Sequence, residues 1–177
     1  MIKLLRKKNF KLRLNKTKIN GPKEAADACP KSNKNSMFTA QFHEINSLLY
    51  TSGYRAAQDS TLLKNFKIDH VINLTAHKCA NIHPNSVSYS SFEFSDNSQF
   101  NLKDKLMEVI QIIAQKIQNK ERVLVHCQMG ISRAPSVVMG YLIKFEDKSF
   151  NTALEEVRLN NPNVCPNIGF LMQLQNL

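Results

Sequence analysis

The chain has 177 residues, of which 42% are hydrophobic and 21% are charged, and these values are typical of one soluble globular domain. No apolar run approaches the ~20 residues needed to cross a bilayer, and no apolar segment opens the chain as a secretory signal would, so we expect neither. The net charge of +10 is uneven, because residues 1–36 hold 11 Lys and Arg against two acidic residues, which leaves residues 37–177 nearly neutral. We therefore expect no nucleic-acid binding by the folded part.

The first segment, residues 1–36, is rich in Lys, Asn and Ser and is interrupted by Pro22 and Pro30. This composition predicts a disordered basic tail before a single folded domain over residues 37–177.

Within this tail, Arg6-Lys7-Lys8 precedes Leu12-Arg13-Leu14. The order resembles a kinase-docking motif, in which basic residues meet an acidic patch and two alternating apolar side chains enter a groove. We therefore expect residues 6–14 to dock a MAP-kinase-type protein. A solubilising or nuclear-import stretch is the main alternative, and the Asn-rich composition argues against a mitochondrial presequence.

The folded part predicts strands that alternate with helices. Alternating apolar residues predict short strands over 38–42, 48–50 and 87–94, and a compact apolar run predicts a buried strand over 71–74. Helical spacing predicts helices over 56–66, 132–145, 150–159 and 168–175, and a long helix that follows Asn101 as its N-cap. With a further strand over 122–125, the pattern predicts an α/β fold with a mostly parallel sheet flanked by helices.

One stretch, residues 123–133, points to a particular chemistry. An apolar strand ends at His126, a loop with a central Gly130 follows, and a helix starts near Ser132. Cys127 then lies at the carboxyl end of a strand and faces the amino end of a helix, where the loop amides of residues 128–133 can form a cradle for an anion.

Such a loop activates a thiol and binds a tetrahedral dianion. Converging amides, a helix dipole and a nearby Arg keep a cysteine in its nucleophilic thiolate form. Arg133 can clamp two phosphate oxygens with its planar fork, and the Ser132 hydroxyl can donate to the sulfur. These residues predict in-line attack by Cys127 on phosphorus through a cysteinyl-phosphate, with the phosphate bound by Gln128, Met129, Gly130, Ile131, Ser132 and Arg133.

The pattern His126-Cys127-x5-Arg133 resembles the signature of the protein-tyrosine phosphatase superfamily, and the chain is similar to its small, single-domain dual-specificity protein phosphatases. Residues 70–74 resemble the early strands of that family, and residues 161–174 resemble its closing segment. The resemblance covers residues 37–177. It implies a protein-tyrosine-phosphatase-like fold, hydrolysis of phosphotyrosine and phosphoserine/threonine, and neither cofactor nor metal.

The resemblance also implies a general acid on a loop about thirty residues before the nucleophile. Asp96 lies 31 residues before Cys127, and Asp104, which falls within the predicted long helix, is the alternative. We expect His126 to shape the loop through packing and hydrogen bonds rather than to act as a base. The family suggests that Asn167 supports the site, although a plain turn or helix cap suits Asn167 equally.

The substrate class and the state of the cysteines are less closely fixed by the sequence. In that superfamily, members that act on phosphoinositides often carry added Lys in this loop, and members that act on RNA 5′ ends tend to have Asn at the place of Ser132. Because Gln128, Met129 and Ile131 are uncharged, the resemblance implies a phosphoprotein substrate over a phosphoinositide or an RNA 5′ phosphate. A phosphoprotein-binding module without turnover is a further alternative. The four cysteines show neither C-x-x-C nor zinc-site spacing. They predict free thiols in a reducing compartment, hence the cytoplasm or nucleus, with Cys79 as a candidate resolving thiol for Cys127.

Overall fold

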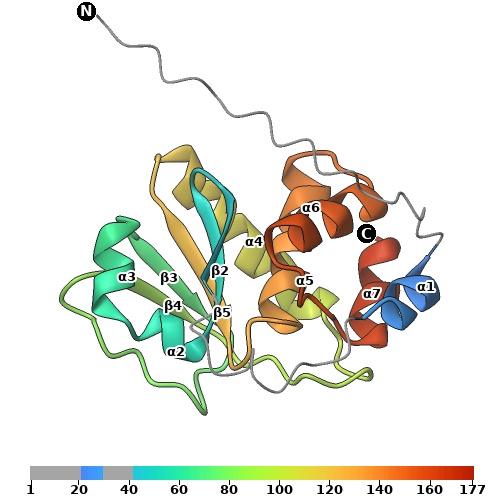
Figure 1. The fold of residues 1–177 in the computed structure, drawn as a ribbon, viewed down its shortest axis with the longest axis horizontal. Helices are drawn as coiled ribbons and strands as arrows, with labels where there is room; N and C mark the ends of the chain where they lie inside the picture. Colours follow the sequence, from blue (N-terminus) through green and yellow to red (C-terminus); the bar gives the residue numbers. More distant parts are fainter. Residues whose placement is uncertain (1–20, 30–41) are drawn as a thin grey trace, which may run out of the picture.

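The computed structural model describes residues 21–29 and 42–177, and a five-stranded sheet forms their centre (Figure 1). The strand order is β1-β2-β5-β3-β4; β1 runs antiparallel to β2, and the other neighbours are parallel. The strands are β1 (Phe42–Asn46), β2 (Leu49–Gly53), β3 (His70–Asn73), β4 (Ser88–Ser91) and β5 (Val123–Cys127). This confirms the predicted α/β fold with a mostly parallel sheet.

Helices cover both faces of this sheet because side chains alternate along each strand. Tyr50, Val71 and Leu124 face a small core shared with the short helices α2 (Tyr54–Ala57) and α3 (Ser60–Asn65). Leu49, Ile72, Val123 and Val125 face the larger core. That core is shared with α4 (Lys103–Gln118), α5 (Arg133–Phe145), α6 (Phe150–Asn160) and α7 (Ile168–Gln175).

Two helix starts differ from the sequence expectation. The single helix expected over 56–66 is two helices, because the Asp59 carboxylate accepts from the amides of Thr61 (2.8 Å) and Leu62 (3.1 Å) and so starts α3. Asn101 does not cap α4. Leu102 occupies the cap position, and its amide donates to the side-chain oxygen of Gln173 at 2.8 Å, so a tertiary contact replaces a local cap.

The tail prediction is wrong for residues 21–29. Residues 22–27 form a short helix, α1 (Pro22–Asp27), which packs against α7 with Ala25 fully buried (Figure 1). A disulfide joins Cys29 to Cys165, so the expectation of free thiols is wrong for this pair, whereas Cys79 and Cys127 are free. Composition missed the helix because its stability comes from contacts with residues far along the chain.

The remaining tail, residues 1–20 and 30–41, lies outside the described residues, and so do the docking motif at 6–14 and the predicted domain boundary at residue 37. Within the described ranges, no helix combines the length and apolar character that crossing a membrane requires.

Candidate active site

The loop between β5 and α5 turns its carbonyl groups outward. Three of them accept hydrogen bonds from the surrounding chain: Gln128 O from Tyr54 N (3.2 Å), Gly130 O from Asn161 Nδ2 (3.2 Å) and Ile131 O from Cys165 N (2.8 Å). Because the C=O and N–H of a trans peptide point in opposite directions, the partner amides of Met129, Ile131 and Ser132 point toward the loop centre. The Gly130 amide donates to Cys127 Sγ at 3.2 Å. The loop is therefore a cup of amides around the sulfur.

Gly130 is required for this turn. Its φ is +74°, and a Cβ on it would lie 2.6 Å from the Gly53 nitrogen and 2.7 Å from the Ser52 carbonyl carbon. Both clashes are with backbone atoms, which cannot move aside as a flexible side chain would. Any other residue would push the loop off β2 and open the cup.

Cys127 ends β5, opposite Gly53 of β2, and is 1% exposed at the base of the cup. The preceding residue, His126, is also buried, and burial lowers its pKa to about 4, an effect that the backbone of Cys127 partly offsets. His126 is therefore neutral near pH 7, and its carbonyl accepts from the Leu74 amide at 3.0 Å. This geometry suits the predicted loop-shaping role better than that of a base.

Arg133 begins α5 and is 7% exposed. Its Nη1 donates to the Phe94 carbonyl at 3.3 Å, and its Nε lies 3.3 Å from Asp96 Oδ2, as an ion pair without the alignment of a hydrogen bond. Asp96 and Arg133 line an open cleft of about 650 Å³, with Lys78 and Lys105 also on its wall. A buried guanidinium beside an open cleft suits recognition of an anion.

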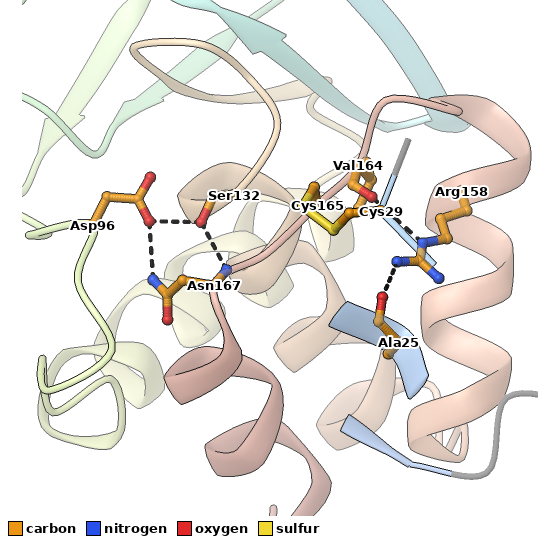
Figure 2. The surroundings of a disulfide bond; sticks show 8 residues. All are labelled: Ala25, Cys29, Asp96, Ser132, Arg158, Val164, Cys165 and Asn167. Carbon is orange, nitrogen blue, oxygen red and sulfur yellow. Dashed lines mark hydrogen bonds between the residues drawn. A yellow bond between two sulfur atoms is a disulfide. The ribbon is translucent and has the colours of Figure 1, made fainter. Parts of the chain in front are cut away.

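Asp96 is the carboxylate that reaches the cup. Its Oδ1 accepts from Ser132 Oγ at 2.7 Å and from Asn167 Nδ2 at 2.9 Å (Figure 2). Asp104, by contrast, lies in the first turn of α4 with an exposed side chain. Of the two candidates, the structure therefore brings only Asp96 beside Arg133.

Comparison with known proteins agrees with this arrangement. Residues 49–177 match the family described as "Dual specificity phosphatase, catalytic domain". The chain belongs to this family. It is 36% identical over 132 residues to dual specificity protein phosphatase 1B of Arabidopsis thaliana, covering 75% of this chain and 78% of that protein.

Further relatives of this dual specificity phosphatase domain include dual specificity protein phosphatase 19 of Mus musculus, at 35% identity over 131 residues that cover 74% of this chain. The solved structure of DUSP15 superposes with a TM-score of 0.71 at 25% identity, covering 76% of this chain and 85% of that one. The chain spans 59% of the mouse protein and 28% of a rhodanese domain-containing relative from Dictyostelium discoideum. The predicted family is thus confirmed.

Ser132 and Asn167 of the phosphatase site make contacts that the local sequence does not predict. The Ser132 hydroxyl makes no cap bond to α5, since it donates to Asp96 and accepts from the Asn167 amide at 3.3 Å. Its donation to the sulfur of Cys127 stays a prediction. Asn167 fills both roles considered for it, because its Oδ1 accepts from Phe170 N at 2.9 Å and caps α7 while its Nδ2 holds Asp96.

Sequence reasoning did not identify two supports of the loop that carries Asp96, Gly169 and Gln173 of α7. A Cβ on Gly169 would lie 2.0 Å from the Ser98 carbonyl oxygen, so only glycine lets this loop rest on α7. The Gln173 side chain donates to Phe100 O at 2.9 Å and accepts from the Leu102 amide. Both lie in the segment that resembles the family, but nothing in the sequence names their partners.

The free cysteines and a possible metal site are the remaining features of this domain. Cys79 and Cys127 are both buried and unpaired, so a disulfide between them on oxidation stays a prediction. Within residues 21–29 and 42–177, no three His, Cys, Asp or Glu side chains gather as a metal site requires.

Proposed function

We propose that this chain is a protein phosphatase that hydrolyses phosphotyrosine and phosphoserine/threonine through a cysteinyl-phosphate. One observation carries the proposal. The outward carbonyls of the loop leave an amide cup around Cys127 Sγ, and the two charged groups that the reaction needs, Arg133 and Asp96, lie together on the cleft beside it. Amides and a guanidinium offer donors to the equatorial oxygens of a phosphate in transfer.

In the first step, the Cys127 thiolate attacks phosphorus and forms an S–P bond while the bond from phosphorus to the seryl, threonyl or tyrosyl oxygen breaks. Protonated Asp96 gives its proton to this leaving oxygen. The amide cup and Arg133 hold the three equatorial oxygens. Ser132 and Asn167 fix the carboxyl group in place through their bonds to Oδ1.

In the second step, water attacks the phosphorus of the cysteinyl-phosphate. The Asp96 carboxylate takes a proton from this water, the S–P bond breaks, and the Cys127 thiolate and inorganic phosphate are released. The same carboxyl group therefore ends the cycle protonated, as it began. No proton needs to come from His126, whose lowered pKa keeps it neutral.

The substrate class follows from the cup's side chains. Gln128, Met129 and Ile131 carry no charge, which suits a peptide better than a polyanionic head group. Lys78 and Lys105 on the cleft wall are the observation that favours the second candidate, a phosphoinositide or an RNA 5′ phosphate. A similar mouse putative dual specificity phosphatase was crystallised with zinc tungstate, and tungstate is a tetrahedral oxyanion like phosphate.

The test compares initial rates on phosphotyrosine and phosphothreonine peptides, a phosphoinositide and a 5′-phosphorylated RNA. We expect turnover of both peptides, inhibition by vanadate, and loss of all activity in Cys127→Ser. Cys79→Ser is the matched control, because it removes the other buried free thiol and should keep wild-type rates.

Preference for the lipid or the RNA would replace the substrate proposal with the second candidate. An inert protein whose Cys127 is verified as reduced would indicate a phosphoprotein-binding module instead. If Cys127→Ser kept the wild-type rate, the proposed nucleophile would be wrong.

We also propose that residues 6–14 dock a MAP-kinase-type substrate and that the protein acts in the cytoplasm or nucleus. The basic residues and the alternating Leu12 and Leu14 support the docking proposal. Replacing both leucines with alanine should raise KM for the phosphorylated kinase and leave KM for a short phosphopeptide unchanged. Equal KM values for the kinase would refute the docking, and a fluorescent fusion of the full chain tests the location.

A further inference from the structure

The disulfide Cys29–Cys165 fastens α1 beside the active site. Figure 2 shows the bond between α1 and the segment that leads into α7, with Asp96, Ser132 and Asn167 to one side. The two cysteines are 136 residues apart in sequence. The bond therefore connects the beginning of the described chain to the loop between α6 and α7.

Cys165 belongs to the support of the catalytic loop. Its amide donates to the Ile131 carbonyl at 2.8 Å, one of the contacts that turn the cup's carbonyls outward. Two residues later, Asn167 holds Asp96 and Ser132. Cys165 is therefore two peptide units from the residue that holds the proposed general acid.

The disulfide is one of several contacts that hold α1 in place. The helix has six residues, too few to be stable alone in water, and Ala25 is its one buried side chain. Arg158 adds a polar contact to α1. Its Nη2 donates to the Ala25 carbonyl at 2.6 Å, and its Nε donates to the Val164 carbonyl at 3.4 Å (Figure 2). Arg158 therefore joins α1 to the residue before Cys165, parallel to the disulfide.

We propose that Cys29–Cys165 is a reversible redox site whose oxidised state holds α1 on α7 and fixes the segment that positions Asp96. A protein dithiol of the thioredoxin class supplies two electrons and two protons, the S–S bond breaks, two thiols form, and the reductant becomes a disulfide. In the reduced state α1 leaves α7, and residues 164–167 lose one of their anchors. The effect on catalysis rests on the proposed role of Asp96.

The expected consequence is selective. A loosened general acid slows substrates whose leaving group needs a proton and spares substrates whose leaving group does not. The amide cup and Arg133 keep their other contacts, so phosphate binding should change little. This pattern separates the proposal from oxidation of Cys127, which stops every substrate.

The experiment compares two preparations of the full chain in which alkylation and mass spectrometry verify that Cys127 is a free thiol. One keeps the Cys29–Cys165 bond, and the other is reduced with dithiothreitol, which is then removed under nitrogen. Hydrogen exchange follows residues 22–29 and 163–170. The rates are measured with two aryl phosphates, one with a poor and one with a good leaving group.

We expect reduction to speed exchange in both segments and to slow the poor substrate ~3–10-fold, a fraction of the whole general-acid contribution. The rate on the good substrate should stay within about twofold, since it needs little proton donation. Cys29→Ser should behave as the reduced protein with or without dithiothreitol, whereas Cys79→Ser, the matched control, should respond as the wild type does.

Identical exchange in the two preparations would overturn the proposal, and so would faster exchange at residues 22–29 with an unchanged ratio of the two rates. A failure of the proposed function looks different. In that case Asp96→Asn itself leaves the ratio of the two rates unchanged, whatever the disulfide does to exchange. If Cys29→Ser did not fold, the two wild-type preparations would still decide the question.

Discussion

The two ends of the parallel sheet hold similar polar residues but use them differently. At the amino end, His70, Asp69 and Arg122 lie beside the start of β3 and β5, and at the carboxyl end His126, Asp96 and Arg133 lie beside their last residues. The amino-end groups bind backbone or neutral hydroxyls. The Asp69 carboxylate accepts from the Arg122 amide at 2.8 Å, and the Arg122 guanidinium donates to the Phe66 carbonyl at 2.8 Å.

At the carboxyl end, the charged groups face one another beside an open cleft. Asp96 Oδ2 lies 3.3 Å from Arg133 Nε, and the Asp96 carboxylate is shared with Ser132 and Asn167. Residue type alone therefore does not make an active site. Charges whose partners are all backbone atoms or neutral hydroxyls support the fold, whereas a pair of opposite charges beside an open cleft can exchange partners when an anion enters.

Replacing Asp96 should have the largest effect on activity. Asp96→Asn keeps the shape but cannot donate or accept the catalytic proton, so kcat on a poor leaving group should fall ~10²–10⁴-fold with substrate binding kept. Asp69→Asn is the same change at the amino end and should leave kcat unchanged. Steady-state kinetics on an alkyl and an activated aryl phosphate measure both. Equal kcat values for Asp96→Asn and wild type would remove Asp96 from its role.

The arginines give the next largest contrast. Arg133→Lys keeps the charge but loses the planar fork, and we expect kcat/KM to fall ~10²–10³-fold. Arg122→Lys, at the amino end, should reduce thermal stability slightly and leave kcat/KM within about twofold, because it loses a half-buried hydrogen bond to a backbone carbonyl that lies away from the cleft. A similar loss of kcat/KM in both variants would show that Arg133 acts through folding alone.

Replacing Gly169 tests how the loop that carries Asp96 rests on α7. In Gly169→Ala, the new Cβ would meet the Ser98 carbonyl at 2.0 Å, so the loop carrying Asp96 must move. We expect a loss of about 1–3 kcal/mol in unfolding free energy, and a fall in kcat of roughly tenfold that is confined to poor leaving groups. Gly140→Ala, whose Cβ meets the flexible Leu106 side chain, should lose stability without this selectivity.

The smallest effect concerns the buried histidines. Burial lowers the pKa of His70 to about 4, with Lys116 adding to the effect. Burial also lowers the pKa of His126 to about 4. Between pH 6.5 and 4 the unfolded chain therefore binds protons that the folded chain does not, and stability falls as the pH falls. At pH 5 each of these two histidines should lower the free energy of unfolding by up to about 2 kcal/mol relative to pH 7.

His70→Gln separates the two histidines, since His70 lies at the amino end. Urea unfolding at pH 7, 6 and 5 should show a loss of unfolding free energy that is smaller than in the wild type by up to about 2 kcal/mol at pH 5, with activity at pH 7 unchanged. A variant as acid-sensitive as the wild type would mean that the protonation of His70 is not linked to folding.

Local pattern and spacing predicted much of the fold and the site. The helix over 168–175 matches α7, and the strand, loop and helix around Cys127 and Arg133 are as expected, because contiguous residues form them. The family pattern predicts Asp96 as the general acid from its distance to the proposed nucleophile, and that role stays a prediction. The split of α2 from α3 was missed because the cap by Asp59 competes with an unbroken apolar face.

Local sequence is enough to predict the backbone cup, because a strand end, Gly130 and a helix start within seven residues leave the backbone few ways to turn. The groups that hold the proposed acid, and the helix on which its loop rests, are brought there by the packing of distant segments. Asn167 and Gly169 meet the Asp96 loop, and Cys29 meets Cys165, across 71 to 136 residues of chain. Such contacts depend on how helices pack on a sheet, and no local pattern encodes that packing.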